Sequence, residues 1–286
     1  MSARPRVALS AAGVLVAASL AAHAATGTAQ GAPPRVTAVR LYVLDGGTLE
    51  NQNPQSYDLT RQQVAATDMS DPVFLIVHPR GTLLWDTGLG DRFAGGREMP
   101  ANASWKVQRT LKEQLAQIGY PPDKVTYLAI SHSHGDHIGN ANDYAGSTWI
   151  VQKPELDLMF GEKPPRSFDV FKALKDSKKV VLQSEDHDVF GDGSIVVKST
   201  PGHTPGHQSL FVKLAKNGPV VLSGDLYHFP EERTLDRVPT FEFNKEQTRA
   251  SRAALEIFLT RSGARLWIQH DMPTYQKLKK SPDYYE

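Results

Sequence analysis

Residues 131–137 read Ser-His-Ser-His-Gly-Asp-His, and four of these seven side chains can bind a metal ion. They follow an apolar run, Val-Thr-Tyr-Leu-Ala-Ile, that is typical of a buried strand. If this strand continues, His132 and His134 point to the same face, because side chains alternate along a strand. Asp136 and His137 follow a glycine and can reach a second point nearby. The spacing favours two adjacent metal ions over one.

The cluster of three histidines and one aspartate points to a particular chemistry. A single histidine is most often a surface residue or a satisfied core residue, but four such side chains within six residues indicate a metal site. Imidazole nitrogens and carboxylate oxygens suit zinc and similar divalent ions. The chain contains no cysteine, which excludes thiolate ligands and disulfide bonds.

Three later stretches carry side chains of the same kind. Residues 201–207 read Pro-Gly-His-Thr-Pro-Gly-His, residues 222–225 read Leu-Ser-Gly-Asp, and residues 267–271 read Trp-Ile-Gln-His-Asp. Together with the His-x-His-x-Asp-His pattern, their order and separations resemble the metallo-β-lactamase superfamily over residues 73–271. The resemblance implies an α/β fold, the four-layer αββα sandwich of that superfamily.

The resemblance also implies two divalent metal ions per chain, which we expect to be zinc. The expected ligands are His132, His134 and His203 for the first ion, Asp136, His137 and His270 for the second, and Asp225 as a bridge between them. A shared carboxylate and a bridging hydroxide reduce the repulsion between two cations, and metal binding brings the pKa of water towards neutrality. The bridging hydroxide is then the expected nucleophile. We expect Asp136 and Asp225 to take part in catalysis as well as in metal binding.

Two further residues are expected beside the metals. Asp86, in Trp-Asp-Thr-Gly, resembles the aspartate of the superfamily that accepts the free N–H of a ligating histidine and fixes its tautomer. A plain turn aspartate is the alternative interpretation. We expect His207 to have a structural role close to the ligands.

Local sequence favours one branch of the superfamily. Residues 71–81 followed by Asp-Thr-Gly-Leu, residues 204–210, and the closing Gln-His-Asp resemble the N-acyl-homoserine lactonase branch. The resemblance implies hydrolytic opening of a lactone ring, with a small-molecule lactone or ester as the partner and quorum quenching as the biological effect.

One position departs from that branch, in which a Tyr commonly lies three residues after the bridging aspartate and helps to hold the substrate. Here that position is His228, and Tyr227 precedes it. If the strand stays extended, Tyr227 shares the face of Asp225. If the chain turns at once, His228 takes the place of the usual Tyr. We favour His228 as the group that holds the substrate or assists the leaving oxygen.

Other functions of the same ligand set stay open. A glyoxalase-type thioesterase shares the ligands, and a broad arylesterase or phosphotriesterase is a further alternative. A β-lactamase is disfavoured, because the nearest ligand set in that group generally lacks the bridging aspartate. The alternative outside the enzymes is a metal-binding partner protein without turnover.

Composition and the N-terminus limit where the protein acts. With 286 residues, 40% of them hydrophobic, and a net charge of +1, the chain can form a large core and shows no sign of a nucleic-acid partner.

The N-terminal sequence predicts a secretory signal peptide, with an uncleaved anchor as the alternative. Its features are Arg4 and Arg6, an apolar run over 7–22 and the Ala-His-Ala at 22–24. We expect export to a bacterial periplasm and no membrane contact after cleavage; a homodimer is left open.

The expected organisation is a signal peptide at 1–24, a flexible linker at 25–35 and the hydrolase domain at 36–286. Apolar patterns predict strands at 36–44, 72–78, 82–85, 148–151, 180–182, 195–198, 208–214, 220–222 and 265–268, and helices at 105–118 and 245–259. The polar stretch 46–69 has no clear period, and we expect it either to cover the site or to form dimer contacts.

Overall fold

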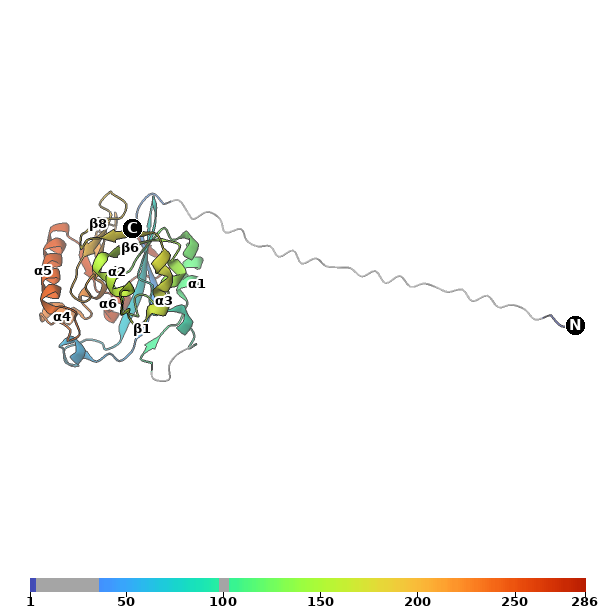
Figure 1. Cartoon of the computed structure of the whole chain (residues 1–286), viewed down its shortest axis with the longest axis horizontal. Helices are drawn as coiled ribbons and strands as arrows, with labels where there is room; N and C mark the ends of the chain where they lie inside the picture. Colours follow the sequence, from blue (N-terminus) through green and yellow to red (C-terminus); the bar gives the residue numbers. More distant parts are fainter. Residues whose placement is uncertain (4–35, 98–102) are drawn as a thin grey trace. The chain divides into compact units, whose positions relative to one another are not determined.

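The structure is a computed structural model, and it describes residues 1–3, 36–97 and 103–286 (Figure 1). The chain divides into two units, residues 1–32 and 33–286, and every helix and strand named below lies in the second. The predicted signal peptide (1–24) and linker (25–35) lie outside the described residues, except for residues 1–3. In the described ranges, no helix has both the length and the apolar character needed to cross a membrane.

The larger sheet has eight strands in the described part of the chain. They are β1 (Arg40–Leu49), β2 (Met69–His78), β3 (Gly81–Trp85), β4 (Trp105–Lys106), β5 (Tyr127–Ala129), β6 (Thr148–Gln152), β7 (Lys179–Leu182) and β13 (Tyr284–Tyr285). Strands β13, β1, β2 and β3 pair antiparallel in this order, and β5, β6 and β7 continue the sheet in parallel. All ten residues of β2 are buried, because both faces of the sheet are covered.

The smaller sheet has five strands within the same described ranges. They are β8 (His187–Asp188), β9 (Ile195–Ser199), β10 (Gln208–Val212), β11 (Val220–Leu222) and β12 (Arg265–Trp267). The first four pair antiparallel in sequence order, and β12 adds to β11 in parallel. The carboxyl ends of β11 and β12 therefore lie at one edge of this sheet.

Short and long helices complete the described part. The α-helices are α1 (Leu111–Gln117), α2 (Lys153–Phe160), α3 (Phe168–Phe171), α4 (Pro230–Thr234), α5 (Lys245–Ser262) and α6 (Met272–Lys277). The 3-10 helices are η1 (Pro54–Tyr57), η2 (Asp91–Phe93), η3 (Pro122–Lys124), η4 (Ala141–Tyr144), η5 (Lys172–Asp176) and η6 (Gly224–Leu226).

Three apolar clusters hold these elements in four layers. Alternating residues of β2 serve two of the clusters: Phe74 and Ile76 pack between the sheets, against residues such as Leu210 and Leu222. Val73 and Leu75 face the other way and pack against α1, α2 and α3. A third cluster joins α5 to the outer face of the smaller sheet, so α5 lies on the side opposite α1 and α3 (Figure 1). The predicted αββα sandwich is confirmed.

Most predicted strands are confirmed with small shifts at their ends, but two local predictions are wrong and one stated condition is not met. The first strand begins at residue 40 and runs to 49, so residues 46–49 are strand and not part of an irregular segment. The helix predicted at 105–118 covers only 111–117, because Thr110 caps it and Trp105–Lys106 pair with β1. Strand β5 ends at Ala129, so His132 and His134 do not lie on a continued strand.

Candidate metal centre

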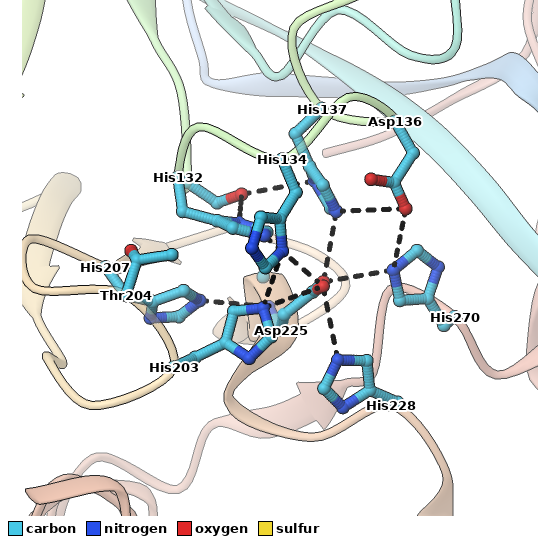
Figure 2. A network of polar contacts seen from close by, with 12 residues as sticks. His132, His134, Asp136, His137, His203, Thr204, His207, Asp225, His228 and His270 are labelled. Carbon is cyan, nitrogen blue, oxygen red and sulfur yellow. Dashed lines mark hydrogen bonds and ion pairs between the residues drawn. The ribbon is translucent and has the colours of Figure 1, made fainter. Parts of the chain in front are cut away.

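The seven predicted ligands come together at one edge of the two sheets (Figure 2). They lie in the loop after β5 (His132, His134, Asp136, His137), the loop between β9 and β10 (His203), the turn after β11 (Asp225) and the loop after β12 (His270). Each of these loops begins where a strand of the buried sheets ends, so rigid backbone fixes its start. We call His132, His134 and His203 the first ligand group, and Asp136, His137 and His270 the second ligand group.

Asp225 lies between the two ligand groups and directs one carboxylate oxygen at each (Figure 2). Its Oδ2 lies 3.4 Å from both His132 Nε2 and His203 Nε2. Its Oδ1 lies 3.1 Å from His137 Nε2 and 3.0 Å from His270 Nε2. This division of the two oxygens is the geometry of a bridging ligand.

Buried nitrogen and oxygen atoms without a hydrogen-bond partner show that these side chains fit metal ions. His132 Nε2, His137 Nε2 and Asp225 Oδ1 are buried and have no hydrogen-bond partner among the described residues. Such atoms cost free energy unless a ligand satisfies them. The ligand atoms of each group, with Asp225 counted in the first, lie within 4.8 Å of one another. Converging imidazole nitrogens and carboxylate oxygens are a donor set for divalent cations.

Local electrostatics favour the same conclusion. Burial, followed by the charge of His137, holds the pKa of His132 well below its usual range, so this ring is neutral and can donate a lone pair. Burial would raise the pKa of Asp225, but the neighbouring imidazoles, His137 first, hold it well below its usual range. Burial would lower the pKa of His137, but Asp225, Asp136 and Asp86 raise it well above its usual range. The site therefore stabilises an anionic Asp225 and added positive charge beside the second ligand group.

Asp86 lies where the sequence predicts it, behind the second ligand group. Its Oδ2 is 2.9 Å from His137 Nδ1, so it orients this ring and leaves Nε2 facing Asp225. Asp86 is fully buried and also accepts from Ser131 N, at 2.5 Å, and from Gln269 Nε2, at 2.7 Å. The main-chain carbonyl of Ser70 lies 2.7 Å from His270 Nδ1 and fixes the other histidine of this group.

Glu242 orients one histidine of the first ligand group in the same way, and the sequence did not predict this residue. Its Oε1 lies 2.8 Å from His203 Nδ1, and both side chains are buried. It lies in the loop between α4 and α5, residues 235–244, and this loop is tied to the ligand loop because Phe243 N donates to the carbonyl of His203 at 3.2 Å. His134, by contrast, is exposed at the cavity.

A second buried glutamate joins two of the ligand loops. Glu155, on α2, accepts from Ser133 N at 2.8 Å, from Thr204 Oγ1 at 2.7 Å and from Gly206 N at 2.9 Å. These donors lie 22 to 51 residues away along the chain. No local spacing marks such a residue, so only the fold identifies it.

His207 supports the bridging aspartate from behind. Its Nε2 accepts from Asp225 N at 2.9 Å, which leaves Nδ1 as the donor to the carbonyl of Thr200, 3.0 Å away. Gly224 makes this contact possible: its φ is 55°, and a Cβ there would lie 2.7 Å from His207 Nε2. These contacts give His207 a structural position next to the ligands, which agrees with the role expected from the sequence.

Tyr227 and His228 have different surroundings, which the sequence left open. The chain turns at Asp225, within η6, so His228 points back and its Nε2 lies 3.2 Å from Asp225 Oδ2. Tyr227 points into the cluster under α5, and its hydroxyl donates to Glu256 Oε1 at 3.2 Å. The structure therefore brings His228, and not Tyr227, to the metal centre.

A cavity of about 390 Å³ opens above the ligands. Its apolar walls are formed by Leu49, Tyr57, Leu89, Phe93, Trp105 and Phe241. Tyr57 comes from the polar stretch 46–69 and packs against the ring of His228, with centroids 4.9 Å apart. The same stretch is bonded to the 235–244 loop, because Thr240 N donates to the carbonyl of Ser56 at 2.8 Å. The stretch 46–69 thus forms part of the cavity wall.

Known proteins of similar sequence and fold support this assignment. The sequence model of the metallo-beta-lactamase superfamily matches residues 67–269. The N-acyl homoserine lactonase AttM of Azorhizobium caulinodans is 29% identical over 265 residues, which cover 88% of this chain and 100% of that protein.

Two solved structures share the fold. An N-acyl homoserine lactone hydrolase, with the product N-hexanoyl-L-homoserine bound at its catalytic metal center, has a TM-score of 0.71 at 23% identity, over 87% of this chain and 100% of that one. AidC, a dizinc quorum-quenching lactonase, has a TM-score of 0.65 at 19% identity, over 88% and 96%. Since the sequence match includes all four ligand stretches up to residue 269, and His270 follows directly, the chain belongs to the metallo-β-lactamase superfamily.

Proposed function

We propose that this protein is a dinuclear metal-dependent hydrolase that opens lactone rings of the N-acyl-homoserine lactone type. The observation that carries the proposal is the position of Asp225, which directs one oxygen at each ligand group. The AttM relative, named for lactonase activity, is aligned over its full length and supports the choice of substrate class. The apolar cavity beside the site offers a surface for an acyl chain.

Different residues of this chain have different roles in the proposed reaction. The two ligand groups and Asp225 would hold two divalent cations, and cations bound there supply an activated water at neutral pH and polarise a carbonyl group. Asp86 and Glu242 hold the rings of His137 and His203 in position. His228 is the chain's own donor next to Asp225, within reach of an oxygen that leaves the carbonyl carbon.

We further propose zinc as the native metal. Five of the seven expected ligands are imidazoles and two are carboxylates, a set that suits zinc better than magnesium or calcium, which prefer oxygen. Metal analysis of gently purified protein should approach two ions per chain. Saturation at one ion per chain would contradict the dinuclear proposal.

Removal of the metals by chelation should lower the thermal stability of the protein, since a ligand at 100 times its Kd stabilises the native state by roughly 2.7 kcal/mol.

A hydrolysis screen tests the substrate class. The mature, metal-loaded protein should open medium- and long-chain N-acyl-homoserine lactones with a higher kcat/KM than it shows for a β-lactam, a glutathione thioester, an aryl ester or a phosphotriester. A higher kcat/KM for one of these others would assign the protein to that activity instead. No turnover on the whole panel, with both metals bound, would favour a metal-binding protein without catalysis.

Export is a separate proposal, supported by Arg4, Arg6, the apolar run over 7–22 and the Ala-His-Ala at 22–24. We propose that cleavage follows Ala24 and that the mature enzyme acts in a bacterial periplasm. Mass spectrometry of the protein from its native host should show a new N-terminus at or near Ala25. An intact Met1 on protein from the cytoplasmic fraction would contradict export.

A further inference from the structure

His228 lies between two carboxylates, and only one of them belongs to the metal centre. On one side, its Nε2 is 3.2 Å from Asp225 Oδ2. On the other side, its Nδ1 is 3.3 Å from Glu232 Oε1, and this nitrogen has no hydrogen-bond partner among the described residues. The Glu232 carboxylate is therefore the group that faces the rear of the ring. Glu232 is completely buried, which is unusual for a charged side chain.

The position of Glu232 is fixed by other contacts. Its Oε1 accepts from His228 N at 3.1 Å and from Phe229 N at 3.2 Å. Its Oε2 accepts from Arg252 Nη2 at 2.5 Å. Arg252 is itself buried and donates through Nε to the carbonyl of Leu226, 2.7 Å away. The carboxylate cannot turn away from His228 without breaking several of these bonds.

A capping role for Glu232 at the start of α4 accounts for only part of this arrangement. The bond from Phe229 N to Oε1 is the glutamate half of a capping box, and His228 N adds a second main-chain donor. A glutamine can accept both bonds without a charge. A buried ion pair such as Glu232–Arg252 is costly to form and is often no more stabilising than apolar residues of similar size. Neither the capping contacts nor the ion pair accounts for a charged side chain at position 232. The Glu232 carboxylate also faces the ring of His228, which indicates a role for it there.

We propose that Glu232 is a positioning residue for lactone opening: it holds the ring of His228 with Nδ1 towards its own carboxylate and Nε2 towards the reacting oxygen. This inference rests on the proposed lactone hydrolysis. A carboxylate that holds a catalytic histidine in the correct orientation is a recurring device in catalysis.

The step balances as follows. The oxygen of a water molecule forms the new bond to the carbonyl carbon, and the bond from this carbon to the ring oxygen breaks. The electron pair of the broken bond stays on the ring oxygen, which takes the proton from His228 Nε2 and becomes a hydroxyl group. Of the two protons of the water, one restores His228 and the other is released when the new carboxylic acid ionises.

The test compares two lactones that differ in the leaving oxygen. A homoserine lactone releases an aliphatic alkoxide, which needs a proton, and the aryl lactone dihydrocoumarin releases a phenoxide, which needs it far less. Glu232→Gln keeps the capping contacts and removes the charge. We expect it to lower kcat on the homoserine lactone by about tenfold or more, with KM and metal content unchanged and a much smaller loss on dihydrocoumarin. Glu232→Asp, which keeps the charge, should retain more of this kcat than Glu232→Gln.

Two controls separate positioning from stability. Arg252→Met breaks the same ion pair but leaves the carboxylate beside His228, so it should lower the melting temperature without a preference between the lactones. Because Glu232 acts through His228, the Glu232→Gln change should cost little further activity in a His228→Ala background. Equal losses on both lactones, or full activity of Glu232→Gln, would overturn the inference.

Failure of the proposed function would give a different result. A wild-type protein that opens neither lactone contradicts the lactonase proposal, and the same comparison on an ethyl and a phenyl ester then decides the role of Glu232. Wild-type protein that hydrolyses none of these four compounds would refute both proposals.

Discussion

The two ligand groups use the same kinds of side chain but are supported by different parts of the molecule. The second ligand group is held from the core, by Asp86 after β3 and by the carbonyl of Ser70 on β2. In the first ligand group, His203 is held by Glu242, on a loop whose neighbouring residues Phe241 and Phe243 are 45% and 66% exposed. The interior of the sandwich therefore supports the second ligand group, and a loop that also forms the cavity wall supports one ligand, His203, of the first.

This difference has a functional consequence. A change in the 235–244 loop reaches the first ligand group directly, because Phe241 lines the cavity and Glu242 holds His203. A change in the cavity wall does not reach Asp86, which is fully buried between Ser131, His137 and Gln269. Both ligand groups have members that line the cavity, among them His134, Asp136 and His270, but the supporting carboxylates differ: Glu242 lies on a loop that forms the cavity wall, and Asp86 does not.

The largest expected effect comes from removing the group that the two sites share. Asp225→Ala takes away both bridging oxygens, so the chain should retain fewer than two metals, and turnover should fall by much more than 10²-fold. Metal analysis and kcat on a lactone measure this. A variant that keeps two metals per chain and wild-type turnover would show that Asp225 bridges nothing.

The next largest effect separates Tyr227 from His228. His228→Ala should lower kcat on a lactone by about 10²-fold with both metals retained, because it removes a donor beside the reacting oxygen. Tyr227→Phe removes only a bond to Glu256 under α5 and should leave kcat within a few-fold of the wild type. A large loss in Tyr227→Phe together with an active His228→Ala would reverse the assignment.

Asp86 and Glu242 test the comparison itself. Asp86→Asn and Glu242→Gln should each weaken metal binding by about 10- to 100-fold, since each removes the carboxylate that orients a ligating histidine. Asp86→Asn should also lower the melting temperature more than Glu242→Gln does, because it disturbs a buried network between the sheets. Titration with a competing chelator and thermal unfolding measure the two effects. Equal melting temperatures would show that the core does not support the second ligand group more strongly.

The smallest expected effect lies at the surface of the same loop. Phe243→Ala, at an exposed position, should change stability by less than about 0.5 kcal/mol and leave metal binding intact.

Phe241→Ala should raise KM for a long-chain lactone, since this ring lines the cavity and packs on His203 with centroids 5.8 Å apart. A KM unchanged in Phe241→Ala would indicate that the acyl chain lies elsewhere.

The sequence alone determined the class of fold and the set of expected ligands. Strands such as β2 and β11 are apolar runs with clear ends, and the ligands follow strand ends in motifs of fixed spacing, as with His132 to His137. Asp86 was expected behind a ligating histidine because its Trp-Asp-Thr-Gly context resembles that of the superfamily. The resemblance that implies the fold and the ligand set is carried by short motifs, so these predictions depend on residues that are neighbours in the chain.

Only the tertiary structure decided which side chains support the expected ligands and which residue beyond Asp225 faces the ligand groups. Glu155 and Glu242 act on partners that lie on other elements, at distances along the chain that no motif records. The choice between Tyr227 and His228 depended on a turn at Asp225, whose φ is −98° and whose preceding Gly224 has a φ of 55°. An extended strand would have placed Tyr227, and not His228, on the face of Asp225. The spacing of apolar residues does not distinguish an extended backbone from a turn at this point. Contacts between distant segments arise only when the sheets pack, so the sequence pattern carries no local sign of them.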